Sequence, residues 1–376
     1  MSREPISTQA ASPPSWPQPA DTMVQHTNFL DILQDPLLSK PQDASAPKPQ
    51  AEQPLCDLLW GYLSLLAVVV TWIAQSEVCQ LVQVDGYNKP MAITWFNHSA
   101  SVVILPILMV AQVDVRGSFH TLFGRELTEW RVWRQAWMLA VVYLAADWVW
   151  YLGLPCLSVA MGTVVFSSSP AWVYLISLTM GQKVQLRKIV ALVACLGGVG
   201  VIFARKGQDN VSLDQAPVPM SVEIMGNVFV LAASFGYAVY QLLFDKTMAQ
   251  IGTDNIWTIN VFVAVMGVLN VVLIWPVLFL VSIPGLPASI REVPEIPSRA
   301  AFTGVMINAS LALAFNISFA VATVKMGPFL TSIATVVTIP MTMVVDATLH
   351  GDHFGCDACV GSLLVLGGFV GLVATS

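Results

Sequence analysis

The residue whose surroundings indicate the most definite chemistry is Asp147, an acid inside an apolar stretch of the chain. Helical spacing places Tyr143 one turn before it, and Trp150 and Tyr151 one turn after it, so that acid and rings share a face. This arrangement suits an organic cation, because the carboxylate supplies charge and the rings supply quadrupoles. The alternative is an acid that hydrogen-bonds to a neighbouring helix while the rings fill the core.

Further polar side chains lie in apolar stretches, where an ionisable group costs about 2.5–3.5 kcal/mol at the centre of a membrane helix. With Asp147 and its rings, the candidates for substrate binding are Glu77, Asn97, Ser168, Tyr237, Gln241, Asn316 and Asp346. His98 and Asn308 stand out for the same reason. Glu77 and Asp346 fall in the outer thirds of their stretches, where an acid can couple protons, line a mouth or snorkel to the interface.

The elements that carry these residues are ten apolar stretches, each near the ~20 residues that a helix needs to cross a bilayer. They lie near 58–83, 91–112, 136–154, 156–180, 187–205, 221–244, 256–282, 301–324, 328–349 and 357–375. The chain is 56% hydrophobic and 11% charged, whereas soluble proteins carry about 25% charged residues. We therefore predict an all-α membrane protein with ten transmembrane helices. Between the second and third helices, residues 113–135 are expected to form an amphipathic interfacial segment.

One set of landmarks occurs twice at the same spacing. Each proline is followed after eleven residues by a glycine, and after 27 and 28 residues by a Gly-Gly pair: Pro170, Gly181, Gly197 and Gly198, then Pro340, Gly351, Gly367 and Gly368. The match predicts a structural repeat of five plus five helices. Because the number of helices per half is odd, the halves are inverted copies, which is typical of secondary transporters. Kinks are expected at both prolines, and close helix packing at Ala194/Gly198 and Gly367/Gly371.

These patterns divide the chain into a disordered cytoplasmic tail (1–55), a first five-helix repeat (56–205), a linker loop (206–220) and a second repeat (221–376). Twelve Lys and Arg residues fall on the side of the N-terminus and five on the other. Both termini are therefore predicted to be cytoplasmic.

Several function classes have little support in the sequence. The net charge of −6 and the lack of basic runs argue against nucleic-acid binding. No phosphate loop, nucleophile elbow or pair of catalytic carboxylates occurs in a polar segment, so we expect neither an enzyme nor a cofactor. His350, His353, Cys356 and Cys359 are metal-ligand types, but their loop is short and has no second Cys pair, so we expect no metal site.

Local motifs resemble the drug/metabolite transporter superfamily of EamA-like proteins, and within it the F subfamily of solute carrier family 35. They are Glu77 with Tyr87-Asn88-Lys89-Pro90, Leu157-Ser158-Val159-Ala160 before Ser168-Ser169-Pro170, and Thr338-Ile339-Pro340 with Asp346, His350-Gly351-Asp352 and Gly361-Ser362. The resemblance covers residues 57 to 376. It implies a multipass transporter of an organic solute, in an endomembrane such as Golgi or vacuole or in the plasma membrane.

We therefore expect a secondary transporter that carries a small vitamin-, amine- or nucleobase-like solute by alternating access. Its expected partners are that solute, a proton or counter-solute, the lipid bilayer and a second copy in a homodimer. Two alternatives remain: a nucleotide-sugar transporter, and a non-transporting membrane scaffold or receptor. Polar residues at membrane depth favour a carrier over a scaffold.

Overall fold

The structure is a computed structural model of the 376-residue chain. It describes residues 55–84, 86–124, 129–153, 156–157, 159–209, 220–286, 291–293, 295–345 and 355–374. All of these belong to one compact unit, Asp43–Ser376. The predictions for the tail, for Asp346 and for His350 and His353 fall outside the described residues.

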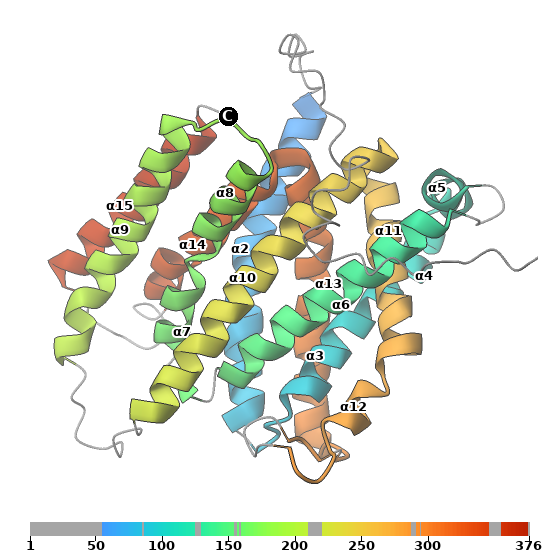
Figure 1. The fold of residues 1–376 in the computed structure, drawn as a ribbon, viewed down its shortest axis with the longest axis horizontal. Helices are drawn as coiled ribbons and strands as arrows, with labels where there is room; N and C mark the ends of the chain where they lie inside the picture. Colours follow the sequence, from blue (N-terminus) through green and yellow to red (C-terminus); the bar gives the residue numbers. More distant parts are fainter. Residues whose placement is uncertain are drawn as a thin grey trace, which may run out of the picture. The chain divides into compact units, whose positions relative to one another are not determined.

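The described residues form helices and include no strand (Figure 1). The helices are α2 (Leu55–Val84), α3 (Pro90–Ser99), η1 (Ala100–Val103), α4 (Ile104–Val110), α5 (Val115–Phe123), α6 (Trp130–Gly153), α7 (Val159–Phe166), α8 (Ser169–Thr179), α9 (Leu186–Asp209), α10 (Met220–Ile251), α11 (Ile256–Leu269), η3 (Asn270–Ile274), α12 (Val277–Leu280), α13 (Arg299–Met326), α14 (Pro328–Val345) and α15 (Cys356–Val373).

Six helical stretches are long and apolar enough to cross a membrane: Asp57–Gln83, Pro90–Val110, Trp130–Gly153, Met161–Thr179, Ser221–Ile251 and Arg299–Met326. Three shorter apolar helices are Ile256–Val272, Pro328–Met341 and Cys359–Val373. Large apolar side chains such as Leu66, Val193 and Leu363 lie exposed on the outer faces of these helices. Lipid tails favour such faces, so the fold is that of an all-α, multipass membrane protein.

Several boundaries differ from the prediction; α10, for example, continues seven residues past 244, to Ile251. Within 113–135, the described residues hold the short helix α5 and the first turns of α6. Trp130 and Trp133 belong to α6, which begins six residues earlier than expected. The ring of Trp133 stacks on Phe123 at 4.2 Å, which fixes the first turn of α6 against α5. At the end of the first half, α9 continues to Asp209, so residues 206–209 are helical rather than part of a linker.

Three of the long helical stretches are interrupted. The first passes from α3 through the 3₁₀ turn η1 into α4, and the second from α11 through the π-helical segment η3 into α12. The third breaks at Ser167 and Ser168, between α7 and α8, where Pro170 lies in the first turn of α8. The matching proline, Pro340, is instead enclosed within α14. Interruptions of this kind expose backbone polar groups, and π-bulges are frequent at functional sites.

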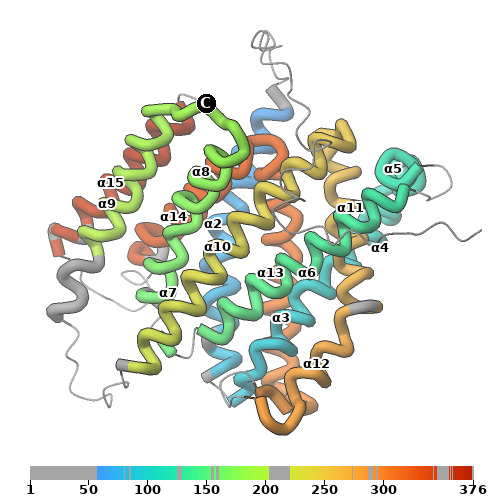
Figure 2. Tube along the Cα trace, in the orientation of Figure 1, coloured from blue at the N-terminus to red at the C-terminus, as the bar shows by residue number. Residues whose placement is uncertain are grey.

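The helices pack in close pairs: α2 on α13, α6 on α10, and α9 on α15, the last pair standing side by side at one edge (Figures 1 and 2). Small residues allow this approach. A Cβ added to Gly198 would lie 2.6 Å from the Gly361 carbonyl oxygen, and one added to Gly368 would lie 3.0 Å from the Ala191 carbonyl oxygen. A Cβ added to Gly367 would meet no described atom within 4 Å, so Gly368, and not Gly367, makes the close approach of this pair in the part of the chain that the structure describes.

Candidate functional site

The centre of the site is a buried pair formed by His98 near the end of α3 and Asp147 on α6. The imidazole Nε2 lies 3.2 Å from the carboxylate Oδ2, and the two side chains are 8% and 12% exposed. Asp147 was predicted from its aromatic stripe, and the structure adds the histidine as its partner. A buried carboxylate without a partner is costly, so this contact explains how the acid is accommodated among apolar helices.

Tyr143 extends the pair into a network of hydroxyl and amide groups. Its ring packs edge to face on His98 at 4.2 Å between centroids. Its hydroxyl donates to Asn316 Oδ1 at 2.6 Å and lies 3.2 Å from the hydroxyl of Tyr237. The Asn316 amide in turn donates to Ser101 Oγ at 3.2 Å. Side chains of α6, α10, α13 and η1 thus meet at one point.

A second branch leaves from Tyr151, one turn after Asp147 on α6. Its hydroxyl accepts from Asn97 Nδ2 at 3.0 Å and from Gln75 Nε2 at 3.1 Å. Asn97 Oδ1 accepts from Asn308 Nδ2 at 2.9 Å. This branch joins α2, α3, α6 and α13, and it places four of the predicted site residues, Asn97, Tyr143, Tyr151 and Asn316, around Asp147.

The interrupted helices meet beside this network. Asn270, the first residue of η3, donates to the Trp95 carbonyl oxygen at 3.2 Å and to Ser99 Oγ at 2.9 Å. Both amide hydrogens are therefore used, and the buried Asn270 Oδ1 has no donor among the described residues. One turn earlier, Gly267 lies so close to η1 that a Cβ would approach Val102 N at 2.8 Å. Backbone of both interrupted helices thus comes into direct contact.

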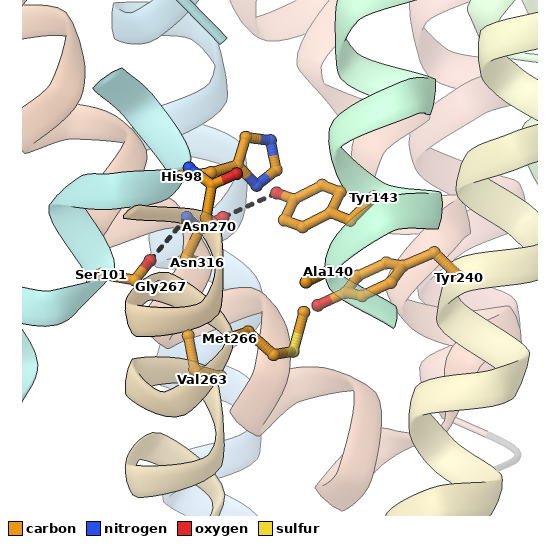
Figure 3. A pocket seen from close by; sticks show the side chains of 10 residues that line it. All are labelled: His98, Ser101, Ala140, Tyr143, Tyr240, Val263, Met266, Gly267, Asn270 and Asn316. Carbon is orange, nitrogen blue, oxygen red and sulfur yellow. Dashed lines mark hydrogen bonds between the residues drawn. The ribbon is translucent and has the colours of Figure 1, made fainter. Parts of the chain in front are cut away.

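A small cavity opens where these elements meet (Figure 3). Its lining includes His98, Ser101, Tyr143, Asn270 and Asn316, with apolar atoms from α11 and the ring of Tyr240. Its volume of ≈10 Å³ is about that of one water molecule in the same measure. In this conformation the site is therefore closed around its own polar groups, so a solute requires the helices to move.

An aromatic cluster covers one side of the network. Trp72 on α2 packs against Trp150, Phe166 and Phe315, with ring centroids 5.9, 5.1 and 5.3 Å away. Phe166 and Trp72 both contact the ring of Tyr237. Trp150, predicted to bind substrate directly, lies in this cluster. Aromatic faces beside the acid provide further surface for a cation.

The remaining predicted residues are not joined to the network by any described contact. Ser168 lies in the turn between α7 and α8, with its Oγ 2.9 Å from Ser234 Oγ. Gln241 is buried on α10, and neither polar atom of its amide has a described partner. Glu77 is half-buried on α2, about 200° around the helix from Gln75 at 100° per residue. Asp346 lies outside the described residues.

The principal residues that the sequence did not place in the site are His98, Ser101 and Asn270. His98 stood out as a polar residue in an apolar stretch, but only the packing of α3 on α6 brings it to Asp147. Asn270 shows the same signal, an amide inside the stretch 256–282. Counting amides within apolar stretches would have found it.

Polar contacts at one end of the helices join the loop before α13 to the start of α3. Glu292, in the loop before α13, accepts the backbone N–H groups of Met91 at 2.7 Å and Ala92 at 3.0 Å, which caps the start of α3. Lys89 also pairs with Glu295 at 3.2 Å. Burial raises the pKa of the Glu292 carboxyl, and the two amides and Lys89 offset this only in part. These contacts fix the start of α3, the helix that carries His98.

Comparison with known proteins gives relatives of one kind. No protein-family model matches the chain. An uncharacterized transporter of Schizosaccharomyces pombe is 24% identical over 82% of this chain and 94% of its own length. The thiamine-repressible mitochondrial transport protein of Saccharomyces cerevisiae is 23% identical over 83% of this chain and 91% of its own. Human solute carrier family 35 member F3 is 20% identical over 77% and 67%.

A solved crystal structure, described only as that of a protein, matches with a TM-score of 0.55 and covers 84% of this chain and 96% of its own. At 12% identity this likeness concerns the fold alone. The sequence relatives are membrane transporters and not enzymes. They confirm the resemblance that the motifs indicated: the chain is similar, over most of its length, to transporters of the solute carrier family 35 type.

Proposed function

We propose that the chain is a secondary transporter that binds a small vitamin-, amine- or nucleobase-like solute at the His98–Asp147 site and carries it by alternating access. The observation that carries this proposal is the buried pair itself, with hydroxyl and amide groups from both predicted halves converging on it. A charge buried at this cost in a membrane helix is typical of a substrate or ion pathway. Exposed backbone of interrupted helices beside the site is typical of transporters.

We also propose that ten spans form two related halves, 56–205 and 221–376, and the pattern of helix contacts supports the relation between the halves. In the predicted repeat, α2 corresponds to α10, α6 to α13, and α8 to α14. Each contact between two helices then has a counterpart between the two corresponding helices. The contact of α2 with α13 corresponds to that of α10 with α6, and the contact of α2 with α14 corresponds to that of α10 with α8. The contact of α3 with α13 corresponds to that of α11 with α6. The predicted repeat exchanges α9 and α15, so the contact between these two helices should contain equivalent residue pairs. The contact of Gly198 with Gly361 corresponds in this way to that of Gly368 with Ala191.

The charge of the site separates the candidate solutes. A nucleotide sugar carries phosphates, and the carboxylate of Asp147 would repel them. An amine or another cation gains from that carboxylate and from the rings of Tyr143 and Trp150. A scaffold or receptor has no need of the buried pair. We therefore place a cationic or neutral organic solute ahead of both alternatives.

Uptake by purified protein in proteoliposomes tests this function. We expect saturable accumulation of a labelled vitamin, amine or nucleobase, and no hydrolysis of ATP. The matched controls are protein-free vesicles and a panel of nucleotide sugars, which should not accumulate. Vesicles that accumulate only nucleotide sugars would contradict the solute class, and vesicles that accumulate no solute of the panel would favour a scaffold.

We also propose that both termini are cytoplasmic. Support comes from the distribution of Lys and Arg, and from the fact that α15 ends at the end of the bundle where α2 begins (Figure 1). A cysteine-reactive or protease-cleavable reporter after Ser376 should be accessible from the cytoplasm and protected from the lumenal side, while one in 210–219 shows the reverse. Access to Ser376 from the lumenal side alone would overturn the orientation.

A further inference from the structure

Few side chains near Asp147 can neutralise the negative charge of its carboxylate. Four titratable side chains lie within electrostatic reach: Cys79 on α2, Tyr143 and Tyr151 on α6, and Tyr237 on α10. Thiols and phenols are ordinarily neutral near pH 7. Among the described residues, Asp147 forms no ion pair with a lysine or an arginine: Lys89 pairs with Glu295, and Lys325 with Asp57 and Asp254. Among the described residues, His98 is the only side chain in contact with the carboxylate that can carry a positive charge.

The imidazole also occupies the place that a cationic solute needs. It lies 3.2 Å from the carboxylate oxygen and packs against the ring of Tyr143, which is the ring best placed to contact a bound cation. In this closed conformation the cavity beside the imidazole measures only ≈10 Å³, so the imidazole fills the space next to the carboxylate. Two positive charges on one carboxylate would leave one of them buried without compensation, which is unfavourable.

We infer that protonated His98 is the internal counter-ion of Asp147 and that a cationic solute displaces it, so that binding one singly charged cation releases one proton. The free site holds His98-H⁺ and Asp147⁻. The cation forms an ion pair with Asp147, and the Nε2–H bond of His98 breaks as its proton passes to water. The charge of the site is zero before and after, so transport is an electroneutral exchange of one proton for one cation. This inference rests on the proposed function and adds its coupling.

The position of His98 couples its imidazole to both interrupted helices. It precedes the turn η1 by two residues, and the adjoining Ser99 is bound by Asn270 of η3. Both interrupted helices therefore move the imidazole when they move. Asn270 Oδ1, an acceptor without a described donor in the same cavity, is available to the displaced imidazole N–H or to a donor of the solute.

The test is proton release by the purified full-length protein in weakly buffered solution near pH 6, with 1-methylnicotinamide as probe. This cation has no group that titrates, and neutral nicotinamide is its matched control. We expect about one proton per bound cation and none with nicotinamide. By linkage, affinity for the cation should rise about tenfold per pH unit where the proton is released. Accumulation in proteoliposomes should follow a pH gradient and ignore an imposed membrane potential.

Two substitutions test whether the released proton comes from His98. His98→Gln should bind the cation with affinity independent of pH and without proton release, while His120→Gln on α5, outside the site, should keep the release of the natural protein. If His98→Gln does not fold, the pH dependence of cation affinity in the natural protein still tests the exchange. Binding without proton release, no binding of the probe, or release that persists in His98→Gln would overturn the exchange. If the exchange is overturned but the protein takes up a neutral solute in the transport assay, the proposed function still stands.

Discussion

Replacing Asp147 with Asn should abolish uptake of a cationic solute, with a loss of at least about tenfold, because 1.4 kcal/mol of lost interaction already gives that factor. Asn keeps the size of the side chain and one acceptor oxygen for His98. It removes the charge that the solute pairs with. Expression and melting temperature should stay close to those of the natural protein, because His98 can lose its proton and the site then holds no unpaired charge.

The measurement is initial uptake in proteoliposomes across several pH values, with melting temperature recorded on the same preparations. Asp254→Asn is the matched control: this acid is exposed, and its carboxylate lies 3.7 Å from Lys325 at the end of α13. It should transport normally. An Asp147→Asn variant that is stable, active and unchanged in its pH dependence would remove the acid from the site. Activity lost in step with stability would assign it a structural role.

The part of the site that sequence predicted best lies within single helices. The stripe of Tyr143, Asp147 and Tyr151 follows from helical spacing alone, and all three residues lie in the observed network. The partner of the acid could not be derived in this way. His98 reaches Asp147 only because α3 packs on α6, and neither helix carries a signal for the other in a single sequence.

The interruptions of the helices were predicted unevenly for a similar reason. Proline gives a local cause, and the break before Pro170 lies where it was expected. The π-helical segment η3 is followed two residues later by Pro276, which cannot donate a backbone hydrogen bond to the carbonyl of Val272. Asn270 is also held by Trp95 and Ser99 of another helix, and a single sequence does not show this contact. Periodicity therefore gave one unbroken stretch, 256–282, where the structure has α11, η3 and α12.

The Gly-Gly pairs offer the sharpest test of the repeat itself, because the two residues of each pair face different ways. In the first half, an added Cβ at Gly198 would meet the Gly361 carbonyl oxygen at 2.6 Å, whereas one at Gly197 meets no described atom of another helix within 4 Å. In the second half, Gly368 would meet Cys195 Sγ at 2.9 Å, and Gly367 again meets nothing. The second glycine of each pair is therefore the contact residue in both halves.

We therefore expect Gly198→Ala and Gly368→Ala to lower stability, by about 1–3 kcal/mol each, because the methyl group forces α9 and α15 apart. The effect should be larger at Gly198, where the nearest opposing backbone atom, the Gly361 carbonyl oxygen, would lie at 2.6 Å, than at Gly368, where the Ala191 carbonyl oxygen would lie at 3.0 Å. Gly197→Ala and Gly367→Ala are the matched controls, each one residue away in the same helix. They should leave stability unchanged or raise it, since Ala favours helix over Gly by about 1 kcal/mol. Thermal unfolding of the four variants in one detergent measures this. Equal losses within either pair would show that α9 and α15 do not pack as described, and would remove the strongest local support for two related halves.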